Sequence, residues 1–178
     1  MSYRTTLLLV IILLLLGSLV YLFPKKNSPE SPLFGPEVWS VDTEKINRIE
    51  IHLPKEGQNV AFVKGSDDFW YFDEEDKSPV DKGRWAGIVL LVSGPSSRRL
   101  ISQKAEDPSV YGFKKPNMEI IVTVQDHETL KVVVGDRTPN RANYYVKLSD
   151  YDPIYTVDRS WQETMKRLVK EPPRPKPE

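Results

Sequence analysis

The 178-residue sequence contains no cysteine, only two histidines and no net charge, because 25 Lys and Arg residues balance 25 Asp and Glu residues. The absence of cysteine excludes disulfides, thiolate nucleophiles, iron–sulfur clusters and cysteine-based zinc sites. A balanced charge argues against a nucleic-acid partner, because domains that bind nucleic acid usually carry a basic surplus.

Motifs that carry catalysis are also missing. His52 and His127 stand far apart, and no H-E-x-x-H helix, G-x-S-x-G turn or phosphate-binding glycine pattern occurs. We therefore expect no enzymatic activity, no cofactor, and no catalytic, cofactor-binding or metal-binding residue.

A long hydrophobic run is present at residues 5–23, "TTLLLVIILLLLGSLVYLF", and it contains no charge. A helix of this length spans about 28 Å, close to the hydrocarbon core of a bilayer. The run is longer than the apolar region of a signal peptide, and no small-residue cleavage site follows it. We expect residues 1–23 to anchor the chain in the lipid bilayer of the bacterial cytoplasmic membrane. In this single-pass arrangement the N-terminus lies inside and the C-terminal domain outside the cytoplasm; a photosynthetic membrane is an alternative.

Proline-rich segments bound the remaining chain. Residues 24–37, "PKKNSPESPLFGPE", predict an extended spacer, in which Leu33 and Phe34 make local contacts. Residues 171–178, "EPPRPKPE", predict a solvated tail, with a proline-rich ligand as the alternative.

Residues 38–170 are expected to form one α+β domain with a mainly antiparallel sheet. Alternation of apolar and polar residues and turn signals such as "GSDD" predict its strands. The first half holds strands at 46–53, 60–64 and 69–72, and the second at 118–124, 129–134, 143–148 and 154–157. Residues 98–102 form a strand that bridges the halves. Each half ends in a helix, so we expect two similar β-rich halves and an internal duplication.

Two segments that begin with Val-Asp predict these helices. "VDKGRWAGIVLLV" places Trp85, Ile88, Val89 and Val92 on one helical stripe, and "VDRSWQETMKRLV" does so for Trp161, Met165, Leu168 and Val169. Asp81 is expected to cap the first helix. Asp158 caps the second, unless Ser160 and Glu163 form a capping box there. A catalytic pair of Asp81 and Asp158 is disfavoured, since carboxylates that accept helix N–H groups stay ionised.

Candidate contact residues for a partner or ligand lie in "GDRTPNRANYY". Arg137, Arg141, Tyr144 and Tyr145 combine the two residue types enriched at interface hot spots. A loop with one buried and one exposed tyrosine is the structural alternative.

Six short motifs in the same order resemble the domain-of-unknown-function 4340 family of bacterial membrane-anchored proteins. They are "INRIEI" after Trp39, "DFWYF…SPVD", "YGFKKP", "VVVGDRT", "NYYVKL" and "IYTVDRSW". Phe113 stands where a leucine is more usual. The resemblance carries over no catalytic residue. It implies an accessory envelope role, associated with ABC-transporter auxiliary proteins of the kind linked to gliding machinery.

These observations predict a membrane-anchored accessory subunit that binds a protein of a bacterial membrane or envelope complex. Two alternatives stay open. One is an extracytoplasmic module that binds a glycan or peptide, and the other is a small subunit of a photosynthetic or respiratory complex.

Overall fold

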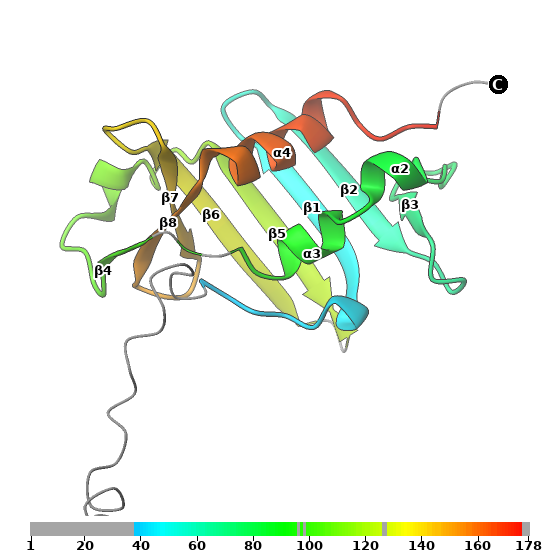
Figure 1. Cartoon of the computed structure of the whole chain (residues 1–178), viewed down its shortest axis with the longest axis horizontal. Helices are drawn as coiled ribbons and strands as arrows, with labels where there is room; N and C mark the ends of the chain where they lie inside the picture. Colours follow the sequence, from blue (N-terminus) through cyan, green and yellow to red (C-terminus); the bar gives the residue numbers. More distant parts are fainter. Residues whose placement is uncertain (1–37, 96, 98, 126–127, 176–178) are drawn as a thin grey trace, which may run out of the picture. The chain divides into compact units, whose positions relative to one another are not determined.

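A computed structural model describes residues 38–95, 97, 99–125 and 128–175. Over these residues the chain forms one eight-stranded sheet in the order β3-β2-β1-β5-β6-β7-β8-β4, in which all paired strands are antiparallel (Figure 1). The strands are β1 (Ile46–Leu53), β2 (Gln58–Lys64), β3 (Trp70–Phe72), β4 (Arg99–Ser102), β5 (Met118–Val124), β6 (Thr129–Arg137), β7 (Asn143–Leu148) and β8 (Ile154–Asp158). The helices are α2 (Lys82–Trp85), α3 (Ile88–Ser93) and α4 (Arg159–Lys170), with the 3₁₀ turns η1 (Thr43–Lys45) and η2 (Pro108–Tyr111).

The predicted antiparallel sheet with few helices is confirmed. Strands β1, β5 and β7 coincide with the predicted ranges, and the other strands differ from them by one to three residues. The strands could be predicted from the sequence because alternate side chains face the core, as in β5, where Met118, Ile120 and Val122 are buried.

The two predicted halves meet within this one sheet. β1 pairs with β5 in its interior; β2 and β3 extend the sheet on the side of β1, and β6, β7 and β8 extend it on the side of β5. β4 does not lie between the halves: it pairs with β8 at the outer edge.

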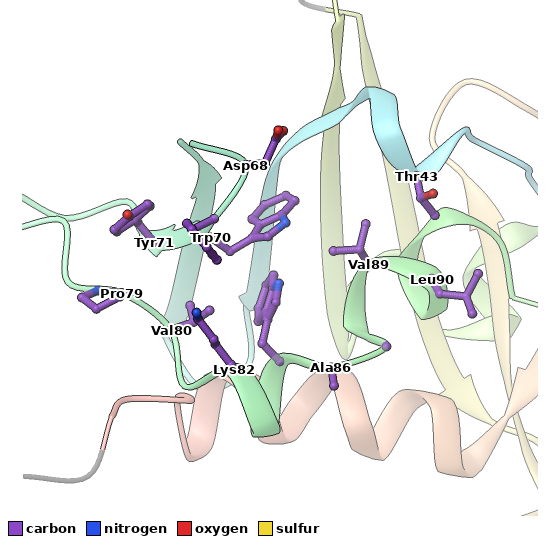
Figure 2. Close-up of a pocket in the computed structure, with 13 residues that line it drawn as sticks. Thr43, Asp68, Trp70, Tyr71, Pro79, Val80, Lys82, Ala86, Val89 and Leu90 are labelled. Carbon is purple, nitrogen blue, oxygen red and sulfur yellow. The ribbon is translucent and has the colours of Figure 1, made fainter. Parts of the chain in front are cut away.

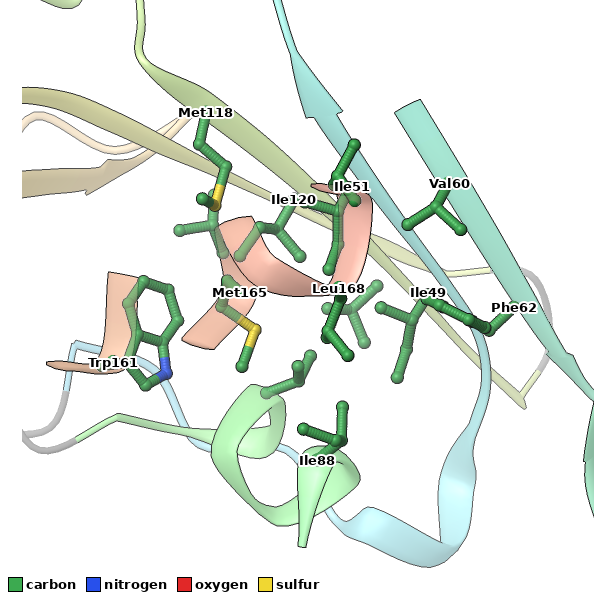
Figure 3. Packing of buried hydrophobic residues seen from close by; sticks show 14 of the residues in the cluster. Ile49, Ile51, Val60, Phe62, Ile88, Met118, Ile120, Trp161, Met165 and Leu168 are labelled. Carbon is green, nitrogen blue, oxygen red and sulfur yellow. The ribbon is translucent and has the colours of Figure 1, made fainter. Parts of the chain in front are cut away.

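One face of the sheet carries the hydrophobic core. The three helices lie across this face (Figure 1). Met165 and Leu168 of α4 face Ile49 and Ile120 of the sheet (Figure 3). The opposite face carries polar side chains in ion pairs, such as Lys131 with Glu119 at 3.0 Å.

The first predicted helix is broken in two, so a single stripe over Trp85, Ile88, Val89 and Val92 was wrong. Asp81 caps α2 as predicted: its Oδ1 accepts a hydrogen bond from the Arg84 amide at 2.8 Å. Gly87 then takes a left-handed φ of 79°, which ends α2 and redirects the chain into α3.

The second predicted helix is confirmed as α4, with Trp161, Met165, Leu168 and Val169 buried. Asp158 occupies the N-cap position, although its side chain accepts no hydrogen bond from the helix amides. Since α4 already begins at Arg159, Ser160 lies inside the helix and not at the cap of the alternative capping box; Glu163 accepts a hydrogen bond from Arg159 at 2.6 Å.

The prediction of a solvated tail was wrong for residues 171–175. Arg84 donates hydrogen bonds to the backbone carbonyls of Glu171 at 2.5 Å and Pro172 at 2.9 Å, and the Asp81 amide donates to that of Pro173 at 2.8 Å. Arg174 lies over the ring of Phe72, 4.4 Å from its centroid. We call residues 171–175 the strap, because they tie the end of α4 to α2 and β3.

The predicted anchor at residues 5–23, the spacer at 24–37 with Leu33 and Phe34, and His127 lie outside the described residues. Within the described part of the chain, every helix is too short or too polar to cross a bilayer.

Candidate functional site

An apolar groove of about 670 Å³ lies between β3 and the two short helices α2 and α3 (Figure 2). Figure 2 shows Trp70 and Val89 on opposite sides of this groove. Phe69 and Leu90 remain 49% and 67% exposed although both are large and apolar. The groove is lined by Thr43, Asp68, Phe69, Trp70, Tyr71, Pro79, Val80, Lys82, Trp85, Ala86, Gly87, Val89 and Leu90.

The wall of the groove at Trp70 and Trp85 belongs to an aromatic cluster. The Trp85 ring centroid lies 4.5 Å from that of Phe62 and 5.3 Å from that of Trp70. The side chains of Trp70 and Trp85 are only 9% and 7% exposed, so close packing fixes their positions. Among the residues that the structure describes, the buried indole Nε1–H of Trp85 has no hydrogen-bond acceptor, which costs about 1–3 kcal/mol. This N–H therefore lies inside the packed aromatic cluster, out of reach of the solvent.

Charged groups stand at the rim. The ammonium of Lys82 lies 4.3 Å from the centroid of the Phe69 ring. Asp68 is paired with Lys64 at 2.8 Å.

Tyr71 and Asp67 form a second rim contact. Asp67 accepts hydrogen bonds from the Tyr71 hydroxyl at 2.6 Å and from the Phe69 amide at 3.2 Å. The Tyr71 hydrogen bond is the main cause that lowers the pKa of Asp67, and the same bond raises the pKa of Tyr71. The Asp67 carboxylate is thus held ionised and bonded by its own turn.

The backbone groups at the outer edge of β3 are already hydrogen-bonded to residues 78–80. Pro79 forms a bridge with Tyr71, while the Val80 amide donates to the Trp70 carbonyl at 3.1 Å and the Phe72 amide donates to the Ser78 carbonyl at 2.9 Å. The strap supports this segment, because Arg174 also donates to the Ser78 hydroxyl at 3.3 Å. The wall at Pro79 and Val80 is therefore fixed from both sides.

The four predicted contact residues lie away from the groove, on β6, β7 and the turn between them. Arg141 is exposed in the left-handed region at φ 60°, and its carbonyl accepts a hydrogen bond from Arg137 at 2.8 Å. Tyr144 packs against the core, while Tyr145 meets Tyr111 edge-on at 4.9 Å. Both tyrosines are half-buried, so the expectation of one buried and one exposed ring was wrong.

The motifs "YGFKKP" and "VVVGDRT" meet at two glycines. A Cβ on Gly135 would overlap the Tyr111 carbonyl, and a Cβ on Gly112 would overlap Asp136. Gly112 also has a φ of 82°. Asn117 fixes the same corner by donating to the Gly135 carbonyl at 2.7 Å and to Asp136 at 3.0 Å. These motifs therefore build a tight turn on the face of the sheet opposite the helices.

Other candidates from the sequence have structural partners. His52 contacts Glu50 at 3.0 Å on β1, and Asp81 is engaged in its cap. In the described ranges, no three His, Asp or Glu side chains lie close enough together to hold a metal ion.

Sequence reasoning missed the groove. Trp85 was singled out as part of the apolar stripe, but Phe69, Lys82 and Leu90 were not. One available signal was Leu90 and Leu91, two large apolar residues outside the predicted helical stripe.

The family model described as Domain of unknown function (DUF4340) matches residues 70–171. The chain belongs to this family. The match runs from β3 to the first residue of the strap, so it includes both glycine motifs and most of the groove, whereas Trp39 and the "INRIEI" motif precede it. Neither the curated proteins nor the solved structures contain a match to the chain.

Proposed function

We propose that this DUF4340 protein is a non-enzymatic, single-pass, membrane-anchored accessory subunit of a bacterial membrane or envelope complex, of the kind associated with ABC transporters. In this proposal residues 5–23 are the anchor, residues 24–37 are the spacer, and the domain at 38–170 lies outside the cytoplasm. The two halves of the domain arose by duplication, an idea supported by the strands that run outward in both directions from the β1–β5 pair.

The observation that carries the interaction role is the rigid turn between β6 and β7. Besides the bond from Arg137 to the Arg141 carbonyl, the Thr138 hydroxyl donates to Asn140 at 2.7 Å, and the Arg141 amide donates to the Thr138 carbonyl at 2.8 Å. The turn holds the Arg141 side chain exposed on a fixed backbone. Such preorganisation lowers the entropy cost of binding, and arginine is enriched at hot spots. Because Arg141 is positively charged, we expect the partner to be a membrane-complex protein that presents an acidic patch to this turn.

The test is affinity purification of the full chain from native membranes in gentle detergent, with quantified co-eluting subunits. We expect Arg141→Glu to reduce a specific subunit by about tenfold, because the substitution reverses the sign of one contact. Lys104→Glu, at another exposed site, is the matched control and should leave the subunit in place. Recovery of only an isolated monomer after crosslinking in membranes would contradict the accessory role. Deletion of residues 5–23 should release the protein from the membrane fraction, and its retention there would contradict the anchor.

A second candidate function is an extracytoplasmic ligand-binding module. The groove at β3, α2 and α3 favours it, since ligand pockets commonly have volumes of about 300–1,000 Å³ and largely apolar walls. The Arg141 turn does not provide the lining of this groove.

A further inference from the structure

We propose that the groove between β3, α2 and α3 binds a single-chain amphiphile, a hydrocarbon chain that ends in a carboxylate. The proposal concerns a different surface from the Arg141 turn, and it depends on the described residues rather than on the anchor. Three features of the groove support it: its apolar walls, the Lys82 ammonium at its rim and its occupied strand edge.

The walls suit a hydrocarbon chain. Trp70, Trp85 and Val80 are buried on one side, and Val89 and Leu90 of α3 stand on the other. The space is preformed, because the aromatic cluster fixes one wall and the strap fixes the loop behind it. Filling the groove with methylene groups would remove the exposed area of Phe69 and Leu90 from water.

One cationic side chain of the groove, Lys82, has no anionic partner among the described residues. Lys82 and Trp85 are three residues apart on α2, so their side chains lie on the same side of this helical turn, and both line the groove. Lys82 is exposed and forms no ion pair with a carboxylate among the residues that the structure describes, whereas the Trp85 N–H is enclosed by the aromatic cluster.

The nearby carboxylates, by contrast, are already satisfied. Lys64 pairs with Asp68, and the Tyr71 hydroxyl and the Phe69 amide donate to Asp67. A ligand carboxylate would give the exposed Lys82 ammonium an anionic partner at the rim of the groove.

An extended peptide fits this groove less well than a hydrocarbon chain. A peptide that adds to a sheet needs a free strand edge for its backbone hydrogen bonds. At β3 the carbonyl of Trp70 and the amide of Phe72 are already bonded to Val80 and Ser78. A hydrocarbon chain has no backbone groups to satisfy, so it can enter the apolar space without that edge.

The test uses photoaffinity labelling of the full chain in lipid nanodiscs. The probe is dodecanoate with a diazirine on its chain, and the comparison probe is a dodecyl ammonium with the diazirine at the same position. We expect the carboxylate probe to label residues 69–90, and Lys82→Met to reduce this labelling by about tenfold, because a charged hydrogen bond is lost. Lys104→Met is the matched control and should have no effect.

Several outcomes would overturn the proposal. They are equal labelling by the ammonium probe, labelling of residues 69–90 no greater than at exposed Val110 and Tyr151, and labelling that survives Lys82→Met. Displacement of the probe by a short apolar peptide with a free C-terminal carboxylate, but not by unlabelled dodecanoate, would assign the groove to a protein partner and reject the amphiphile. Labelling within residues 5–23 serves as the separate readout of the anchor, so a failed anchor and a failed groove are distinguishable.

Discussion

The guanidinium Nη2 of Arg174 lies 2.7 and 2.9 Å from the two carboxylate oxygens of Glu74, 100 positions earlier in the chain. This contact, together with the bonds from Arg84 to the carbonyls of Glu171 and Pro172, fastens the strap across α2 and β3. The end of the chain therefore stabilises the wall of the groove.

The Arg174–Glu74 pair should contribute modestly to stability. Both side chains are about half exposed, and exposed ion pairs contribute about 0.2–1 kcal/mol. We expect a double-mutant cycle of Arg174→Ala and Glu74→Ala to give a coupling energy in that range, measured by urea unfolding of the full chain in detergent. A coupling of zero in low salt would show that the pair contributes nothing to the strap.

Gly112→Ala should be strongly destabilising. The new methyl group would overlap Asp136 and would occupy a left-handed backbone, so we expect a loss of about 2–4 kcal/mol in the free energy of unfolding. Gly57→Ala is the matched control, since Gly57 has a similar φ of 63° and no atom of the described residues lies within 4 Å of the added Cβ; it should cost only about 1 kcal/mol. Equal losses for the two variants would refute the packing role of the glycine motifs.

The two helix-associated tryptophans should respond differently to replacement by phenylalanine. Trp161 Nε1 donates to the Leu91 carbonyl at 2.8 Å, whereas Trp85 Nε1 has no acceptor within the described ranges. Both changes lose ring volume, but only Trp161→Phe also loses a hydrogen bond. We expect Trp161→Phe to cost about 1 kcal/mol more than Trp85→Phe, measured by the same urea unfolding. A larger cost at Trp85 would mean that its N–H is satisfied in the protein.

The Asp67–Tyr71 hydrogen bond should make stability depend on pH at both extremes. The folded-state pKa of Asp67 is lowered, so its contribution is present above its unfolded pKa and is lost as the pH falls through the folded value. The pKa of Tyr71 is raised, so its contribution is present below its unfolded pKa and is lost as the pH rises through the folded value.

Tyr71→Phe tests this coupling. It should raise the pKa of Asp67 toward its ordinary value, and Asp67→Asn should lower that of Tyr71, both measured by NMR titration. Asp107 is the control, because hydrogen bonds from Ser109 lower its pKa independently of Tyr71. An unchanged Asp67 titration in Tyr71→Phe would contradict the coupling.

Most of the sheet could be predicted because each strand repeats a two-residue pattern that needs no knowledge of its neighbours. Ile49, Ile51 and Leu53 alternate with polar residues and are all buried. The break at Gly87 was missed because the apolar spacing from Trp85 to Val92 also fits one helix. In the folded protein Trp85 packs on Phe62 and Trp70, and the Val92 carbonyl accepts a hydrogen bond from Trp39. The chain makes these two sets of contacts with two short helices and not with one straight helix.

The candidate sites were less predictable than the strands. Arg137, Arg141, Tyr144 and Tyr145 share one segment of the sequence, so their grouping on two paired strands and a turn followed from hairpin geometry. The groove combines residues from β3, α2, α3 and η1, which only the packing of these elements brings together. The docking of Arg174 on Phe72 and Glu74 is equally long-range.

The antiparallel strands, the cap at Asp81, the buried stripe of α4 and the family could be predicted from the chain's residues, because they depend on local periodicity and short motifs. The strand order, the break between α2 and α3, the strap and the apolar groove could not. These features depend on contacts between residues far apart in the chain, such as Trp85 with Phe62 and Trp39 with Val92, which form only when the chain folds.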